Sequence, residues 1–184
     1  MCDATLVGPL FGSPDLTPSF VRENLRFVET YEATSIEPVR KSVTVGTSPQ
    51  RAFAVFTAHI QEWWPLRTHS VGIDDAAGIA LGDGVGAAIV ETLADGTTSV
   101  WGTVTVWEPP HRVEFTWHAG TPEAQATSVE VTFTQDEPGS TVVRLVHSGW
   151  ERRPDGSSAR EGYESGWDPV IRRFAETASH PRRR

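Results

Sequence analysis

The chain has 184 residues, with 24 acidic and 16 basic side chains and a formal net charge of −8. This charge argues against general nucleic-acid binding, which needs clustered lysines and arginines, and no apolar run approaches the roughly 20 residues that cross a bilayer. The single cysteine, Cys2, excludes an intrachain disulfide, and the first residues lack the pattern of a secretory signal, so we expect a cytoplasmic protein.

The length fits one domain with extensions at its ends. Residues 1–37 hold three prolines and then apolar residues at helical spacing, which predict a short amphipathic helix. We expect this extension to pack on the main domain, with docking of a partner or a second copy as the alternative. Residues 179–184 form a basic tail, interpreted as a solvated end. The main domain is therefore predicted over residues 38–178.

The main domain begins with alternating valines from Val39, which predict a strand. Ser48 and Pro49 predict a helix start, with Ser48 as the N-cap and Pro49 as the first helical residue. The helical pattern that follows buries Phe56 and must end before Pro65, because the residue preceding a proline is disfavoured in helical conformation.

Two adjacent tryptophans, Trp63 and Trp64, close this helical stretch. Neighbouring side chains diverge on a helix, so the two indoles cannot face the same surroundings. We expect Trp63 to enter the core and Trp64 to lie at the rim of a cavity, with the reverse assignment open because helix phase is uncertain at a frayed end. Arg67, His69 and Ser70 would then form a polar edge of that opening.

A long region of alternating apolar residues follows, divided by turn sequences such as Asp95-Gly96. Six strands are expected there, near residues 77–81, 86–94, 97–107, 112–118, 127–135 and 141–148. The chain ends in a helical pattern, in which Pro169 should either kink the helix or delay its start to about Asp168. This order of elements predicts an α+β fold with segregated helices and strands.

Hairpin geometry predicts which strand residues share a face. A two-residue turn at Asp95-Gly96 places Glu91 opposite Val100 on an almost wholly apolar face, which we expect to be buried and concave. Glu91 would be its lone carboxylate and should lie at the rim, reaching water or Arg67, with a functional carboxylate as the alternative.

The same pairing places Gly102 opposite Trp117, either as plain packing or as one wall of a pocket. The opposite face of the sheet would carry Trp101 and Trp107, an unusual pair for a face that meets solvent. We expect the N-terminal extension to cover these two indoles, with a second subunit of a homodimer as the alternative.

Several stretches together resemble one family. They are EWWPLRTHS at 62–70, WGTVTVWEPPHRVEFTW at 101–117, TVVRLVHSGW at 141–150 and GYESGWDPVIRRFAE at 162–176. Over about residues 38–178 the chain resembles the START-like, or SRPBCC, superfamily, and within it the branch related to the C-terminal domain of the activator of the heat-shock protein 90 ATPase. The resemblance implies a helix-grip fold, in which a curved antiparallel sheet of about seven strands wraps around the C-terminal helix and leaves a cavity between them.

The resemblance also implies binding of hydrophobic or amphipathic small molecules, and some family members are cyclases, hydrolases or chaperone-associated proteins. The chain lacks the separate N-terminal domain of the chaperone activator, which argues against direct ATPase activation. The side chains expected around the cavity are Phe56, Trp63, Trp64, His69, Glu91, Gly102, Phe115, Trp117, Phe133, His147, Trp150 and Trp167.

Two histidines allow different interpretations. His147 continues a buried row of the last strand, so it is either a core histidine satisfied by a neighbour or a group that contacts ligand or acts as a general base. His69 has the same alternatives, and its loop position favours the rim of the cavity.

Other chemistry has little support in the sequence. Histidines are dispersed and cysteine is single, so no metal site is predicted. The glycines of residues 82–86 precede a strand and predict a hairpin rather than a phosphate-binding loop. No nucleophile elbow occurs. We therefore assign no cofactor, no metal and no catalytic residue.

Three functions remain. The leading hypothesis is a cytoplasmic protein that binds a hydrophobic or aromatic small molecule between sheet and helix, without chemistry of its own. The second is a cyclase, hydratase or hydrolase, in which at least two of Glu91, His69 and His147 must converge on one empty site. The third is a chaperone-associated interaction protein, which would need an exposed apolar patch outside the cavity.

Overall fold

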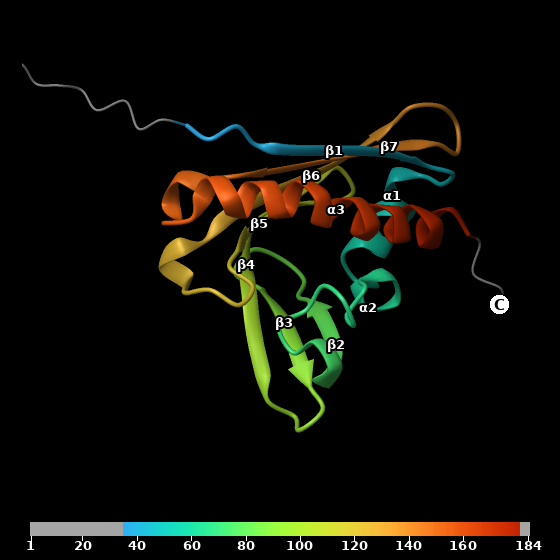
Figure 1. The fold of residues 1–184 in the computed structure, drawn as a ribbon. Helices are drawn as coiled ribbons and strands as arrows, with labels where there is room; N and C mark the ends of the chain where they lie inside the picture. Colours follow the sequence, from blue (N-terminus) through green and yellow to red (C-terminus); the bar gives the residue numbers. More distant parts are fainter. Residues whose placement is uncertain (1–34, 181–184) are drawn as a thin grey trace, which may run out of the picture. The chain divides into compact units, whose positions relative to one another are not determined.

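A computed structural model describes residues 35–180, which form one seven-stranded antiparallel sheet with three α-helices (Figure 1). The strands are β1 (Val39–Val45), β2 (Ala76–Leu81), β3 (Ala88–Leu93), β4 (Thr98–Glu108), β5 (Arg112–Trp117), β6 (Thr127–Gln135) and β7 (Thr141–Ser148). Their order in the sheet is β1-β7-β6-β5-β4-β3-β2, a meander from β2 to β7 that β1 joins beside β7. The six strands expected after the first are confirmed. The amphipathic helix expected within residues 1–37 lies outside the described residues.

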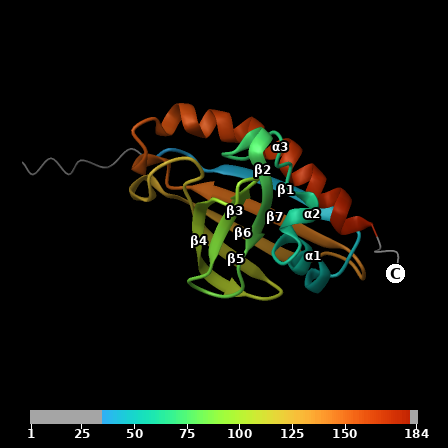
Figure 2. The ribbon, with the colours of Figure 1, turned by 90° about the horizontal axis from the view of Figure 1, so that it is seen from below.

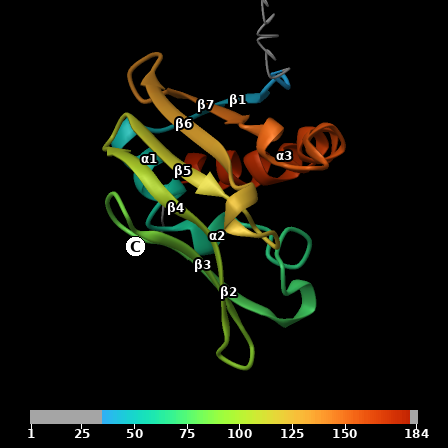
Figure 3. The same ribbon diagram turned by 90° about the vertical axis from the view of Figure 1, so that its left-hand side faces the viewer.

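The sheet curls around the long helix α3 (Gly156–Ser179). Viewed along the helix, β1 and β7 lie on one side of α3 and the hairpins of β2, β3 and β4 curve away below it (Figure 3). Turned by 90° from Figure 1, α3 runs along the length of the sheet (Figure 2). Its inward residues, among them Trp167, Val170 and Phe174, are buried against the strands. This arrangement confirms the predicted α+β, helix-grip fold.

The prediction that α3 could start near Asp168 is wrong, because the helix begins at Gly156 and continues through Pro169. A proline inside a helix removes the hydrogen bond to the carbonyl four residues earlier. Here that carbonyl belongs to Ser165, and both Ser165 and Pro169 are exposed, so water can replace the missing donor.

Two short helices follow β1, as predicted. In α1 (Pro49–Phe56) the Ser48 hydroxyl accepts a hydrogen bond from the Arg51 N–H at 3.4 Å, and Pro49 is the first helical residue. Helix α2 (Ile60–Trp63) ends where Trp64, the residue before Pro65, adopts an extended conformation. Short 3₁₀ turns lie at Ile73–Asp75, Glu123–Gln125 and Trp150–Arg152.

Strand β4 carries two β-bulges that the sequence did not reveal. Ile89 lies opposite Gly102 as predicted, but Val90 lies opposite Val100, so Trp101 is an extra residue in the pairing with β3. A second irregularity between Val104 and Val106 shifts the pairing with β5. Each extra residue reverses the face on which the subsequent side chains lie.

The bulges turn both tryptophans of β4 inward. Trp101 is fully buried, and Trp107 packs edge-on against Phe53 of α1 with ring centroids 5.1 Å apart. Val100, expected on the concave face opposite Glu91, is instead 47% exposed, and Glu91 pairs with Ser99. The prediction that Trp101 and Trp107 lie on the outer face, beneath the N-terminal extension or a second subunit, is therefore wrong.

Candidate functional site

A pocket of about 420 Å³ lies between the sheet and α3. The segment after α2 and the sheet contribute Trp64, His69, Ser70, Val71, Trp101, Trp117 and Ala119 to its lining. The start of α3 and the turn before it contribute Arg153, Asp155, Ala159, Gly162, Tyr163, Gly166, Trp167 and Val170. Four of the predicted cavity residues thus line one pocket: Trp64, His69, Trp117 and Trp167.

Four indoles form the aromatic wall of the pocket: Trp64, Trp117 and Trp167 each keep a small exposed area, and the fully buried Trp101 supports them from behind. The ring of Trp64 lies 5.5 Å from Trp101, 5.6 Å from Trp117 and 6.0 Å from Trp167, measured between centroids. Trp101 and Trp117 are 5.4 Å apart in an edge-to-face arrangement. Such geometries are favourable for aromatic pairs, so the rings hold one another in position.

Each indole N–H in this wall donates to a partner within the protein. Trp64 donates to the His69 carbonyl at 2.6 Å and Trp101 to the Glu91 carboxylate at 3.0 Å. Trp167 donates to a ring nitrogen of His147 at 3.1 Å. Trp117 donates to the Tyr163 hydroxyl at 2.9 Å. Because these donors are already used, the wall offers a ligand mainly carbon surface.

Trp63 lies deeper in the core than Trp64, although the two rings are only 5.6 Å apart between centroids. It is fully buried, donates to the Val55 carbonyl at 2.8 Å, and packs on Phe56 and Phe174 at centroid distances of 5.1 and 5.3 Å. The extended backbone at Trp64 turns the second indole toward the pocket instead.

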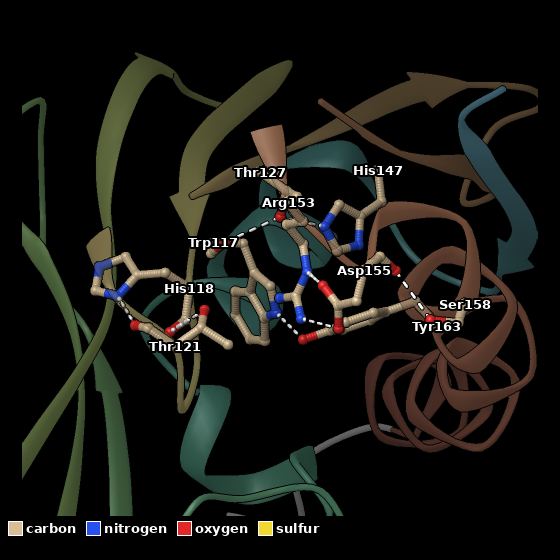
Figure 4. A network of polar contacts seen from close by, with 9 residues as sticks. All are labelled: Trp117, His118, Thr121, Thr127, His147, Arg153, Asp155, Ser158 and Tyr163. Carbon is tan, nitrogen blue, oxygen red and sulfur yellow. Dashed lines mark hydrogen bonds and ion pairs between the residues drawn. The ribbon is translucent and has the colours of Figure 1, made fainter. Parts of the chain in front are cut away.

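A polar end of the pocket is built at the start of α3 (Figure 4). The Arg153 guanidinium donates through Nε and Nη2 to both carboxylate oxygens of Asp155, at 2.9 and 3.0 Å. This bond raises the pKa of Arg153, which therefore stays charged. Burial raises the pKa of the Tyr163 phenol, so its hydroxyl stays protonated as a donor.

His147 is a satisfied core histidine and does not line the pocket. Its Nδ1 accepts the Trp167 N–H, so Nε2 carries the proton and donates to the Thr127 hydroxyl at 2.7 Å, which in turn donates to the Trp117 carbonyl at 2.9 Å. Burial, with a smaller contribution from the positive charge of Arg153, lowers the pKa of His147 to about 3. The neutral ring thus anchors Trp167 from behind.

We expect His147 to make the protein less stable in mild acid. Because the folded pKa of about 3 lies below the ordinary value, the unfolded chain takes up a proton that the native chain does not. Stability should therefore fall by up to about 1.4 kcal/mol per pH unit below roughly pH 6.5, until the folded histidine itself titrates. Urea unfolding between pH 7 and 4.5 would measure this slope, and His147→Gln should flatten it. An NMR titration of His147 with a midpoint near 6.5 would contradict the assignment.

Glu91 is fully buried, so its predicted place at the rim is wrong. Its carboxylate accepts hydrogen bonds from the backbone N–H of Val71 at 3.1 Å, from that of Gly72 at 2.9 Å and from the Trp101 indole at 3.0 Å. Arg67, its expected partner, lies exposed. The bulge at Trp101 brings the indole N–H beside the carboxylate, and three donors then satisfy a charge that would otherwise be costly to bury.

The other predicted cavity residues lie in the core. Trp150 is buried and donates to the His147 carbonyl at 3.0 Å. A Cβ at Gly102 would overlap the Thr116 carbonyl, so this glycine allows close strand approach rather than forming a pocket wall. Three further residues predicted to line the cavity are buried and do not line the pocket: Phe56, Phe115 and Phe133. The same holds for Trp63, Glu91 and His147.

Most residues on the α3 side of the pocket were not among the predicted cavity residues. Ala159, Gly162 and Gly166 line it beside Tyr163 and Trp167, at spacings of three and four residues that place them on one helix face. The pattern was visible in the sequence, but small residues carry no apolar signal. Arg153 and Asp155 precede the helix and gave no signal.

Among residues 35–180, no helix is long and apolar enough to cross a membrane. Within the same range, no group of three histidine, cysteine or acidic side chains is arranged to hold a metal ion.

Comparisons with known proteins agree with the fold. The family model described as Activator of Hsp90 ATPase homolog 1-like protein matches residues 46–179. An anthrahydroquino-gamma-pyrone synthase, Txn09, is 35% identical over 77% of this chain and 97% of its own, with a TM-score of 0.56. The Aha1 dimer from Colwellia psychrerythraea is 17% identical over 80% of this chain and 100% of its own, with a TM-score of 0.59. An HSP90 activator from Plasmodium falciparum is also 17% identical, over 79% and 99%, with a TM-score of 0.54. None of the curated proteins matches the chain.

Proposed function

We propose that this chain, which belongs to the family of Activator of Hsp90 ATPase homolog 1-like proteins, binds a flat aromatic small molecule in the pocket between the sheet and α3. A volume of about 420 Å³ lies within the usual range for small-molecule sites. Its wall of four indoles with occupied N–H groups offers carbon surface for stacking against fused rings.

The observation that carries this proposal is the pair of glycines on the pocket side of α3. Glycine inside a helix costs about 1 kcal/mol relative to alanine. At Gly162 and Gly166 an added Cβ would have no described atom within 4 Å apart from its chain neighbours and the nearby backbone of α3 itself, so close packing against other elements does not require glycine there. Glycines that lower helix stability and are not needed for packing are expected where the space beside them is kept open for a ligand.

The likeness to the synthase supports the ligand class. That protein's name contains anthrahydroquino-gamma-pyrone, a fused aromatic system, and the chain covers nearly all of it at 35% identity. Catalysis on such a molecule is the second candidate, and it would show as a change in ligand mass or retention time after incubation. The arrangement first expected for an enzyme does not occur, because His69 lines the pocket while Glu91 and His147 are buried behind it.

The remaining proposals have less support. The Aha1 dimer and the HSP90 activator are each 17% identical, so they support the fold and not a chaperone partner. A homodimer would agree with the dimeric Aha1 structure, and light scattering after gel filtration would test it. A cytoplasmic location remains our proposal.

Titration with anthraquinone-2-sulfonate, a flat three-ring probe, would test aromatic binding. We expect saturable quenching of tryptophan fluorescence, because the pocket wall contains four indoles. The Kd should be on the order of 10 μM. Benzenesulfonate, which has the same charge and one ring, is the control and should quench little at equal concentration. Equal, non-saturating quenching by both compounds would argue against a specific aromatic site.

A further inference from the structure

Two hydrogen-bond donors at the polar end of the pocket have no acceptor in the described part of the chain. The Tyr163 oxygen accepts the Trp117 N–H at 2.9 Å, which orients the phenol, and no acceptor for its own hydrogen is found among residues 35–180. Arg153 uses Nε and Nη2 on Asp155, and its Nη1 has no partner within the described part of the chain. Both side chains line the pocket, and that of Arg153 is only 10% exposed.

We propose that this end of the pocket selects aromatic molecules that carry a carbonyl or phenolate oxygen, which accepts hydrogen bonds from the Tyr163 hydroxyl and from Nη1 of Arg153. The inference rests on the proposed aromatic site and adds its specificity. The indole wall cannot supply this selection, since all four of its N–H groups are already bound.

The chemistry of the two groups determines which ligand they favour. Asp155 neutralises most of the Arg153 charge, so the end of the pocket attracts a partial negative charge and does not require a full anion. A hydrocarbon of the same shape would cover two donors without replacing their bonds to water, and this loss lowers affinity. We expect a discrimination of about tenfold, as for one lost hydrogen bond to a charged or strongly polar group.

Fluorene and 9-fluorenone form a matched probe pair, because they share a flat three-ring skeleton and differ in one carbonyl. Equilibrium dialysis would give both Kd values for the full chain and for Arg153→Met and Tyr163→Phe. The ratio of the two Kd values is compared between variants, because the difference in hydration of the two free compounds is the same in every ratio and cancels in that comparison. Arg152→Met is the control, because Arg152 belongs to the same turn, donates to the Ala126 carbonyl and does not line the pocket.

In each pocket variant we expect the preference for 9-fluorenone over fluorene, measured as the ratio of their Kd values, to fall about tenfold. The Kd of fluorene should stay within twofold of its value in the unaltered protein. The control should keep the preference. The infrared carbonyl band of bound 9-fluorenone should lie at lower wavenumber in the unaltered protein than in either pocket variant. An unchanged preference and carbonyl band in both variants, with fluorene still bound, would overturn the inference and leave the aromatic site standing. Failure of the unaltered protein to bind either compound would overturn both.

Discussion

Replacing Gly166 by leucine is expected to abolish binding of anthraquinone-2-sulfonate, with a loss of at least about 100-fold, and at the same time to stabilise the protein. Gly166 lines the pocket, and a Cβ added there meets no described atom of another element within 4 Å, so the leucine side chain would extend into the space of the pocket. Leucine is favoured over glycine inside a helix by about 0.5–1 kcal/mol. Fluorescence titration and urea unfolding of the same preparation would measure both effects.

Ser165→Leu provides the matched control. Ser165 is the neighbouring residue on α3, is exposed, and does not line the pocket. It should leave the Kd unchanged, because its side chain points away from the ligand. A Gly166→Leu protein that is folded and binds the probe as tightly as before would show that the probe binds elsewhere, and the pocket would lose its assignment.

These opposite effects on stability and binding follow from one feature of α3. The inward residues Trp167, Val170 and Phe174 are buried and stabilise the domain, whereas Gly162 and Gly166 one turn apart leave space beside them. A helix optimised only for stability would fill that space. The same helix therefore closes the core at one end and opens a site at the other.

The sequence predicted the elements of the fold because periodicity and turn residues are local. Ser48 and Pro49 fix the start of α1, and the end of α2 before Pro65 follows from backbone sterics. The strand bounds follow from apolar alternation. The start of α3 could not be fixed because the polar residues after Gly156 lack an apolar stripe, so the sequence leaves a start near Asp168 open beside a longer helix that includes Pro169.

The site was predicted less well because it depends on register. One extra residue at Trp101 moves that indole from the supposed outer face to the pocket wall and places Glu91 beneath it. Bulges leave no reliable trace in a pattern of alternating residues. Buried partners such as Thr127 for His147 likewise arise from strands that are distant in the sequence.

Glu91→Gln is expected to destabilise the protein by about 3 kcal/mol and to weaken probe binding. The buried carboxylate accepts three hydrogen bonds and faces three donors, so an amide NH₂ group in its place must oppose at least one N–H. Leaving a buried donor unsatisfied costs about 1–3 kcal/mol, and more when the lost partner was charged. Hydrogen exchange should become faster at the amides of Val71 and Gly72.

The effect on binding follows because Val71 and Trp101, both held by Glu91, line the pocket. The carboxylate also fixes the chain just before Ile73, a β-branched residue whose φ of 48° is unfavourable and persists only where neighbouring contacts hold it. Glu130→Gln makes the same chemical change on β6, where the carboxylate pairs with Arg112 at 2.7 Å and is 37% exposed, so it should cost less than about 1 kcal/mol. The two variants should lose different amounts of stability, because only the Glu91 carboxylate is desolvated and faces three donors. Equal losses would therefore mean that Glu91 is not the buried anchor of the pocket wall.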